Sequence, residues 1–109
     1  NRLFVNGFGS NNQPNGIVGF IDIRNGKFTR LSSLSGYFDG IQVDNNILYL
    51  SNWVSFDEKG VIESIDLRNP NTTKIVKTPV LSGPADFVIH KGKIVVPQML
   101  TGILLSIDL

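Results

Sequence analysis

Few side chains in this chain of 109 residues are suited to catalysis or metal binding. Cysteine is absent, which excludes disulfides, thiolate metal sites and cysteine nucleophiles. The chain has one histidine, His90, so the residue count alone does not exclude a Ser-His-Asp triad. Because it stands beside Lys91-Gly92 in a short turn, we expect a solvated turn residue. Gly7-Phe8-Gly9 is too short for a phosphate-binding fingerprint and no predicted helix follows it, which argues against nucleotide binding.

Charge and composition restrict the partners and the fold class that we expect for this chain. Ten Lys+Arg against nine Asp+Glu give a net charge of +1, and the basic residues are scattered rather than clustered. No nucleic-acid partner is therefore expected. No apolar run approaches the roughly 20 residues of a transmembrane helix. The chain has 12 Ile, 10 Val, 7 Phe, 11 Gly and 11 Asn but one Ala, which favours strands and tight turns over helices.

Three sequence features repeat every 42 to 47 residues. The first is a glycine, two aliphatic residues and a terminal Ile-Asp-Ile/Leu, at 16–23, 60–67 and 102–109. The second is a short apolar run at 2–5, 47–50 and 93–96, followed three residues later by a bulky apolar residue: Phe8, Trp53 or Met99. The third pairs 38–43 with 85–89.

Each repeated feature is typical of a β-strand bounded by turn residues. The predicted strands are 2–8, 17–23, 27–31, 39–44, 47–53, 61–67, 74–78, 86–90, 93–98 and 103–109. Four antiparallel strands per repeat are typical of a β-propeller blade. The prediction is an all-β partial β-propeller of two and a half four-stranded antiparallel blades. Residues 1–35 give strands two to four of one blade, 36–80 a complete blade, and 81–109 the first three strands of the next.

Structural roles follow from these positions. Asn25-Gly26 predicts a two-residue hairpin turn. The repeated Asp22, Asp66 and Asp108 are expected to end the third strand of each blade and to stabilise the hairpin. Phe8, Trp53 and Met99 either pack between adjacent blades, which we favour, or line a ligand surface. The predicted core residues are Ile41, Val43, Leu48, Leu50, Ile65 and Val88.

The chain resembles the six-bladed propellers of the SMP-30/gluconolactonase type and, more loosely, the NHL-repeat propellers. The resemblance rests on Phe38-Asp39-Gly40-Ile41, on the stretch 81–87, on the strand 47–53 and on the terminal Gly-x-x-x-Ser-Ile-Asp-Leu pattern. It spans about two of the family's six blades. The implied partners are the remaining blades, from the same parent chain or from another copy, because a ring needs about four to eight blades.

The resemblance implies a role for two carboxylates. In the lactonase branch, an Asp or Asn that opens the innermost strand of successive blades binds one divalent cation, commonly calcium. Asp39 and Asp86 match by position, although Phe87 follows Asp86 where the motif has Gly. The alternative is structural, because such an Asp also accepts hydrogen bonds from turn amides, and we favour this role.

The functional prediction is a binding or scaffold propeller segment that presents a small-molecule or protein ligand surface at the mouth of the central channel. The expected ligand-binding residues are Asn52, Trp53 and Gln98, beside the loops 9–15 and 54–59. The alternative is a metal-dependent hydrolase of sugar lactones or related esters that uses Asp39 and Asp86. Asn71-Thr72-Thr73 fits the N-glycosylation pattern, which matters only in a eukaryotic secreted protein. The expected location is extracytoplasmic or secreted.

Overall fold

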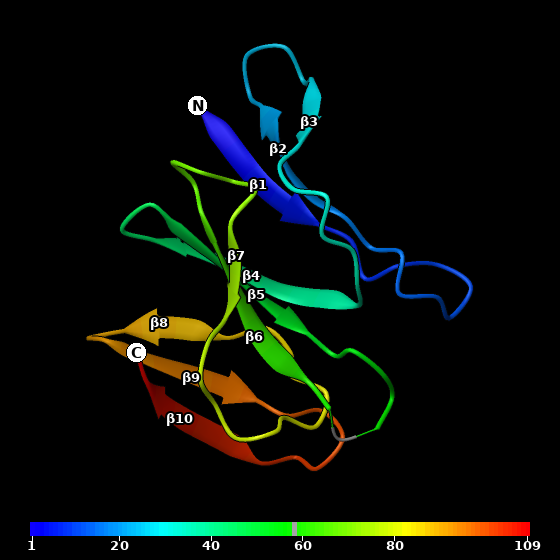
Figure 1. The fold of residues 1–109 in the computed structure, drawn as a ribbon, viewed down its shortest axis with the longest axis vertical. Coiled ribbons are helices and arrows are strands. Elements are labelled where there is room, and N and C mark those ends of the chain that lie inside the picture. The colour runs from blue at the N-terminus through cyan, green and yellow to red at the C-terminus, as the bar shows by residue number, and fades with distance from the viewer. Residues whose placement is uncertain (58) are drawn as a thin grey trace.

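The fold is all-β, as the sequence predicts, and it follows the pattern of a partial β-propeller (Figure 1). The computed structural model describes residues 1–57 and 59–109, and this part of the chain forms three antiparallel sheets. The first sheet has the order β1-β2-β3 and contains β1 (Arg2–Asn6), β2 (Val18–Asp22) and β3 (Phe28–Arg30). Among the described residues, no helix is long and apolar enough to cross a membrane.

The second sheet is the complete four-stranded unit, with strands in sequence order. It contains β4 (Phe38–Asp44), β5 (Ile47–Asn52), β6 (Val61–Asp66) and β7 (Thr73–Ile75). The third sheet has the order β10-β9-β8 and contains β8 (Val88–His90), β9 (Lys93–Pro97) and β10 (Leu104–Asp108). The three sheets succeed one another along the molecule, from the blue to the red end of the chain in Figure 1.

The hydrophobic core lies between neighbouring sheets, in two separate clusters. Alternation along each strand sends one set of side chains to each face of the middle sheet. Leu48, Leu50 and Ile65 pack with Val18 of the first sheet and with Phe38. On the opposite face, Ile62 and the partly buried Tyr49 pack against the third sheet, whose contribution includes Ile94, Val96 and Ile107. The middle sheet is therefore covered on both sides.

One predicted hairpin turn, at Asn25-Gly26, has a different form in the structure. Two-residue turns with positive φ at both central residues do occur, at Asn45-Asn46 and at Lys91-Gly92. At Asn25-Gly26 only Gly26 has positive φ, and the flanking backbone bond runs from the Asp22 amide to the Lys27 carbonyl. The prediction of a two-residue turn there is wrong, because the chain makes a wider loop around the Asp22 carboxylate.

The matching turns also correct the alignment of the third repeated feature. Since Asn45-Asn46 and Lys91-Gly92 occupy the same place, counting back along β4 and β8 matches Gly40, not Asp39, with Asp86. The pairing of Phe38 with Asn52 and of Pro84 with Gln98 agrees with this register.

The same one-residue offset explains an error in the predicted core. Val88 matches Gln42 rather than Ile41, so it lies on the opposite face of its sheet and is exposed. Val43 is also exposed, because the first sheet has no strand that corresponds to β4 and so leaves the end of β4 uncovered. Leu48, Leu50 and Ile65 are fully buried as predicted, and Ile41 is partly buried.

Candidate functional site

Four aromatic side chains gather at one end of the first two sheets. Phe8 follows β1, Tyr37 precedes β4, and Trp53 and Phe56 follow β5. Ring centroids lie 5.3 Å apart for Phe8 and Trp53, 5.0 Å for Tyr37 and Phe56, and 5.9 Å for Trp53 and Phe56. These separations lie in the range of favourable aromatic contacts. Tyr37 is buried, whereas Phe56 is half exposed, so the cluster presents a ring to solvent.

The loops that carry the cluster are held by specific hydrogen bonds. The Tyr37 hydroxyl donates to the Asn12 carbonyl at 2.6 Å, which ties the loop 9–15 to the rings. On the other side, Val54 has a φ of 66°, a left-handed conformation that is unfavourable for a β-branched residue. Its amide donates to Asn52 Oδ1 at 2.9 Å, and this bond holds the turn that leads to Phe56. Glu58, in the predicted ligand loop 54–59, lies outside the described residues.

Asp39 extends the aromatic cluster with a carboxylate. The indole Nε1 of Trp53 donates to Asp39 Oδ2 at 3.3 Å. Partial burial raises the pKa of Asp39, the Trp53 hydrogen bond lowers it, and the negative charge of Asp86 raises it. Asp86 is thus close enough to act on Asp39 electrostatically, although the two residues do not share a register position. Both carboxylates are exposed to solvent.

A close backbone approach positions these two carboxylates. A Cβ added at Gly40 would lie 2.8 Å from both the Ala85 carbonyl oxygen and the Asp86 Cα, so only glycine fits there. Ser51 bridges the two segments, because its Oγ accepts from the Gly40 amide at 2.7 Å and donates to the Ala85 carbonyl at 2.9 Å. Asn6, at the matching place on β1, donates to the Gly40 carbonyl at 3.4 Å.

The two predicted amide ligands, Asn52 and Gln98, are buried and bonded within the protein. Asn52 Nδ2 donates to Glu63 Oε2 at 2.9 Å, while its Oδ1 accepts from the Tyr37 and Val54 amides. Gln98 Oε1 accepts from the Ser82 amide at 2.9 Å. Asn52 and Gln98 occupy equivalent places in the second and third sheets. Each accepts a hydrogen bond from the backbone segment that precedes β4 or β8. Their role in ligand binding stays a prediction.

The remaining residues singled out in the sequence lie apart from the aromatic cluster or at its edge. Asp22 and Asp66 accept from the amides of Arg24 and Arg68, each at 2.9 Å, and pair with the same arginine side chains. This arrangement agrees with the predicted hairpin role. Asp108 pairs instead with Lys93 across the β9–β10 ladder. His90 is exposed at the end of β8. Phe8 and Trp53 pack together as favoured, whereas Met99 is largely exposed.

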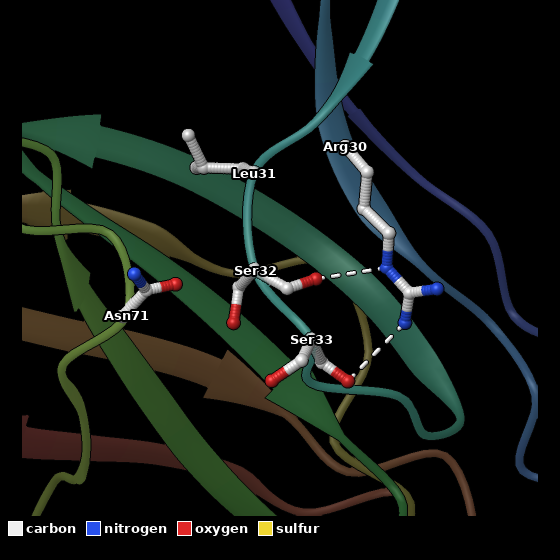
Figure 2. A pocket seen from close by; sticks show the side chains of 5 residues that line it. All are labelled: Arg30, Leu31, Ser32, Ser33 and Asn71. Carbon is white, nitrogen blue, oxygen red and sulfur yellow. Dashed lines mark hydrogen bonds between the residues drawn. The ribbon is translucent and has the colours of Figure 1, made fainter.

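A separate open hollow of about 380 Å³ lies between the segment after β3 and the turn before β7 (Figure 2). Its charged group is the Arg30 guanidinium, which donates to the carbonyls of Ser32 at 2.8 Å and Ser33 at 3.2 Å. Asn71 of the N-glycosylation pattern also lines it. Because Arg30 is already occupied by backbone carbonyls and the hollow is wide open, we favour the aromatic cluster as the functional site.

The metal-ligand prediction rests on two carboxylates in this chain. Among residues 1–57 and 59–109, no group of three or more His, Cys, Asp or Glu side chains is placed to hold a metal ion. Calcium takes about six to eight oxygen ligands, so Asp39 and Asp86 alone do not make a complete calcium site. No protein-family model, curated protein or solved structure matches this chain.

Sequence reasoning named Phe8, Trp53, Asp39 and the loop 54–59, which carries Phe56, but it did not single out Phe56 or Tyr37. Both lie outside the strands, at places where the repeats offer no matching aromatic residue. The variable length of the loop 54–59 was the available signal, since irregular loops on a regular scaffold often carry function.

Proposed function

We propose that this chain is a binding segment of a β-propeller, and that its ligand surface is the aromatic cluster with Asp39. The observation that carries the proposal is the hydrogen bond from Trp53 to Asp39 beside the exposed ring of Phe56. Aromatic faces attract cations through the ring quadrupole, and a neighbouring carboxylate adds charge attraction. The ligand group that fits best is therefore a cation such as an ammonium or guanidinium, on a small molecule or on a protein partner.

The test uses tetramethylammonium as a probe and Trp53 as the reporter. Trp53 is the only tryptophan in the chain, so a change in emission reports the site directly. Titration at constant ionic strength, with sodium as the matched cation, should give a saturable change. Phe56→Ala and Asp39→Asn should each weaken binding about fivefold, as expected for loss of one cation–π or charge contact. Phe28→Ala, a similarly exposed aromatic on β3, is the matched control. An unsaturable response identical to that of sodium would contradict the proposal.

A second proposal is a metal-dependent hydrolase of lactones or related esters, with Asp39 and Asp86 as two cation ligands. The effect of the Asp86 charge on the pKa of Asp39 favours it, because neighbouring carboxylates attract a divalent cation. Calcium should then raise Tm, because a ligand that binds only the folded state stabilises it. Asp39→Asn and Asp86→Asn should abolish that shift, while Phe56→Ala should retain it. A Tm that does not respond to calcium would remove this candidate.

A further inference from the structure

The two outer sheets each have one face that no other part of the described chain covers. The apolar residues of the leading face of the first sheet are Leu3, Val5, Ile21 and Phe28, which the strand register places on one side together with Gly19 and Arg30. The apolar residues of the trailing face of the third sheet are Val88, Val95, Pro97 and Leu104, and the same register places His90, Lys93, Ser106 and Asp108 on this side as well. Leu3, Phe28, Val88 and Leu104 are all exposed large hydrophobic residues. Exposed apolar faces of this kind mark interaction sites.

The exposure of the trailing face can be compared with that of the equivalent positions in the other two sheets. Val18, Ile62 and Leu104 occupy the same place in the three sheets, two residues after Gly16, Gly60 and Gly102. Val18 and Ile62 are 0% exposed because the next sheet covers each of them, whereas Leu104 is 67% exposed. Leu104 therefore stands at a position that is buried wherever a following sheet is present.

The leading face shows the same relation in reverse. Leu3, Leu48 and Ile94 are equivalent, because each lies one residue after the partner of Asp22, Asp66 or Asp108 in its ladder. Leu48 and Ile94 are 0% exposed against the preceding sheet, and Leu3 is 54% exposed. The uncovered leading face of the first sheet therefore corresponds to faces that are covered in the other two sheets, where the trailing face of the preceding sheet packs on them.

The packing of a trailing face on a leading face occurs twice within the chain. The trailing side of the first sheet, including Phe4 and Val18, meets the leading side of the second. The trailing side of the second sheet, including Tyr49 and Ile62, meets the leading side of the third. A third contact of the same type needs one trailing and one leading face, and each copy of the chain carries one of each.

We propose that the trailing face of one copy packs on the leading face of a second copy, so that two such contacts join two chains head to tail. Two copies contribute six sheets, since the described part of each chain forms three, and a closed propeller has about four to eight blades. Two contacts related by a two-fold axis close such a pair, whereas a contact that did not close would produce fibres.

The test measures mass by analytical ultracentrifugation over a range of protein concentrations. The wild-type chain should reach twice its 12.0 kDa mass. Leu104→Asp and Leu3→Asp should each produce a monomer, because either change places a charge in both contacts. Val80→Asp, at an equally exposed hydrophobic residue outside both faces, should remain dimeric. All three positions are exposed, and an unchanged circular dichroism spectrum would establish that the variants are folded. The Tm of the two monomeric variants should fall below that of wild type, because they lose the stabilisation that the partner copy supplies.

A mixture of the two variants distinguishes head-to-tail packing from other dimers. The Leu3→Asp chain keeps a normal trailing face and the Leu104→Asp chain keeps a normal leading face, so the mixture should dimerise through one intact contact. A wild-type chain that stays monomeric at every concentration would overturn the proposal and leave the faces to sheets from elsewhere. Dimers that survive Leu3→Asp or Leu104→Asp would overturn it as well, as would a mixture that stays monomeric.

Discussion

The side chain of Asn52 donates a hydrogen bond to the buried carboxylate of Glu63 at 2.9 Å, across neighbouring strands β5 and β6. The same amide accepts two backbone hydrogen bonds through Oδ1, from Tyr37 and Val54. One side chain therefore satisfies a buried acid and fixes the backbone on both sides of the aromatic cluster.

Asn52→Ala should destabilise the protein by about 2–4 kcal/mol, because it leaves Glu63 without this donor and two amides without their acceptor. Urea denaturation followed by Trp53 emission measures the change. Gln98→Ala, at the equivalent place, removes one bond to the Ser82 amide and should cost only about 1 kcal/mol. Equal losses for the two variants would show that neither the Glu63 contact nor the second backbone hydrogen bond of Asn52 contributes.

Asp39→Asn should raise stability at neutral pH. The folded-state pKa of Asp39 lies above its ordinary value of 3.8, mainly through burial, so the native state holds this proton more tightly than the unfolded state. Stability therefore falls as pH rises from about 3.8 through the folded pKa, and the penalty persists at neutral pH. Asparagine removes the charge and keeps an oxygen for Trp53. Thermal melts should show a higher Tm for the variant at pH 7 and no gain well below pH 3.8.

Asp66→Asn should have the opposite sign. The Arg68 side chain and amide lower the pKa of Asp66, so this carboxylate contributes stability above its ordinary value of 3.8, which is lost as pH falls through the folded pKa. The variant should melt slightly lower than wild type at pH 7, because exposed ion pairs contribute little, and equally in strong acid. Asp22→Asn provides a replicate at the matching turn. A deficit that persists in acid would assign the effect to the turn rather than to the charge.

Gly40→Ala should destabilise the fold by about 1–3 kcal/mol, a typical cost of overpacking. The new methyl group meets backbone atoms of Ala85 and Asp86, which cannot rotate away. Gly26→Ala is an informative comparison, because that residue has open space around it but a positive φ of 72°. Chemical denaturation gives both values, and a neutral Gly40→Ala would mean that the strands separate without cost.

Val54→Gly should stabilise the chain by about 1 kcal/mol, since a β-branched residue in the left-handed region is strained and glycine is not. The amide that donates to Asn52 is retained, so the turn should keep its shape. Differential scanning calorimetry measures the gain. Val80→Gly, also exposed and outside the strands, has no such strain to relieve and should not show it.

The architecture could be predicted because the same strand pattern occurs three times in the sequence. Three copies of one pattern identify the strands, and turn residues such as Asn45-Asn46 bound them. Register was harder: Asp39 and Asp86 align by eye, but the turn geometry moves the match to Gly40. A single-residue shift changes the face of every side chain, which is why Val88 was misplaced.

The candidate site could be predicted only in part. Trp53 stands in a repeated position, and Asp39 lies in a stretch that resembles the one around Asp86, so both were visible in the sequence. Tyr37 and Phe56 reach the cluster through irregular backbone, including the left-handed Val54, and such conformations depend on tertiary contacts that a pattern does not encode. Asn52 was predicted to bind ligand, and its burial could not be foreseen because its side chain donates to Glu63, two residues away from its own ladder partner Val61.

The two separate core clusters on either side of the middle sheet have a consequence for amide exchange with solvent deuterium. Each outer sheet is anchored by one cluster, whereas the middle sheet is anchored by both. In an array whose units contact only their neighbours, the end units open more easily than the centre. In a single copy, such as the monomeric Leu3→Asp variant, the amides of β5 and β6 should therefore exchange last, only when the whole chain unfolds, and those of β1 and β10 should exchange through smaller local openings.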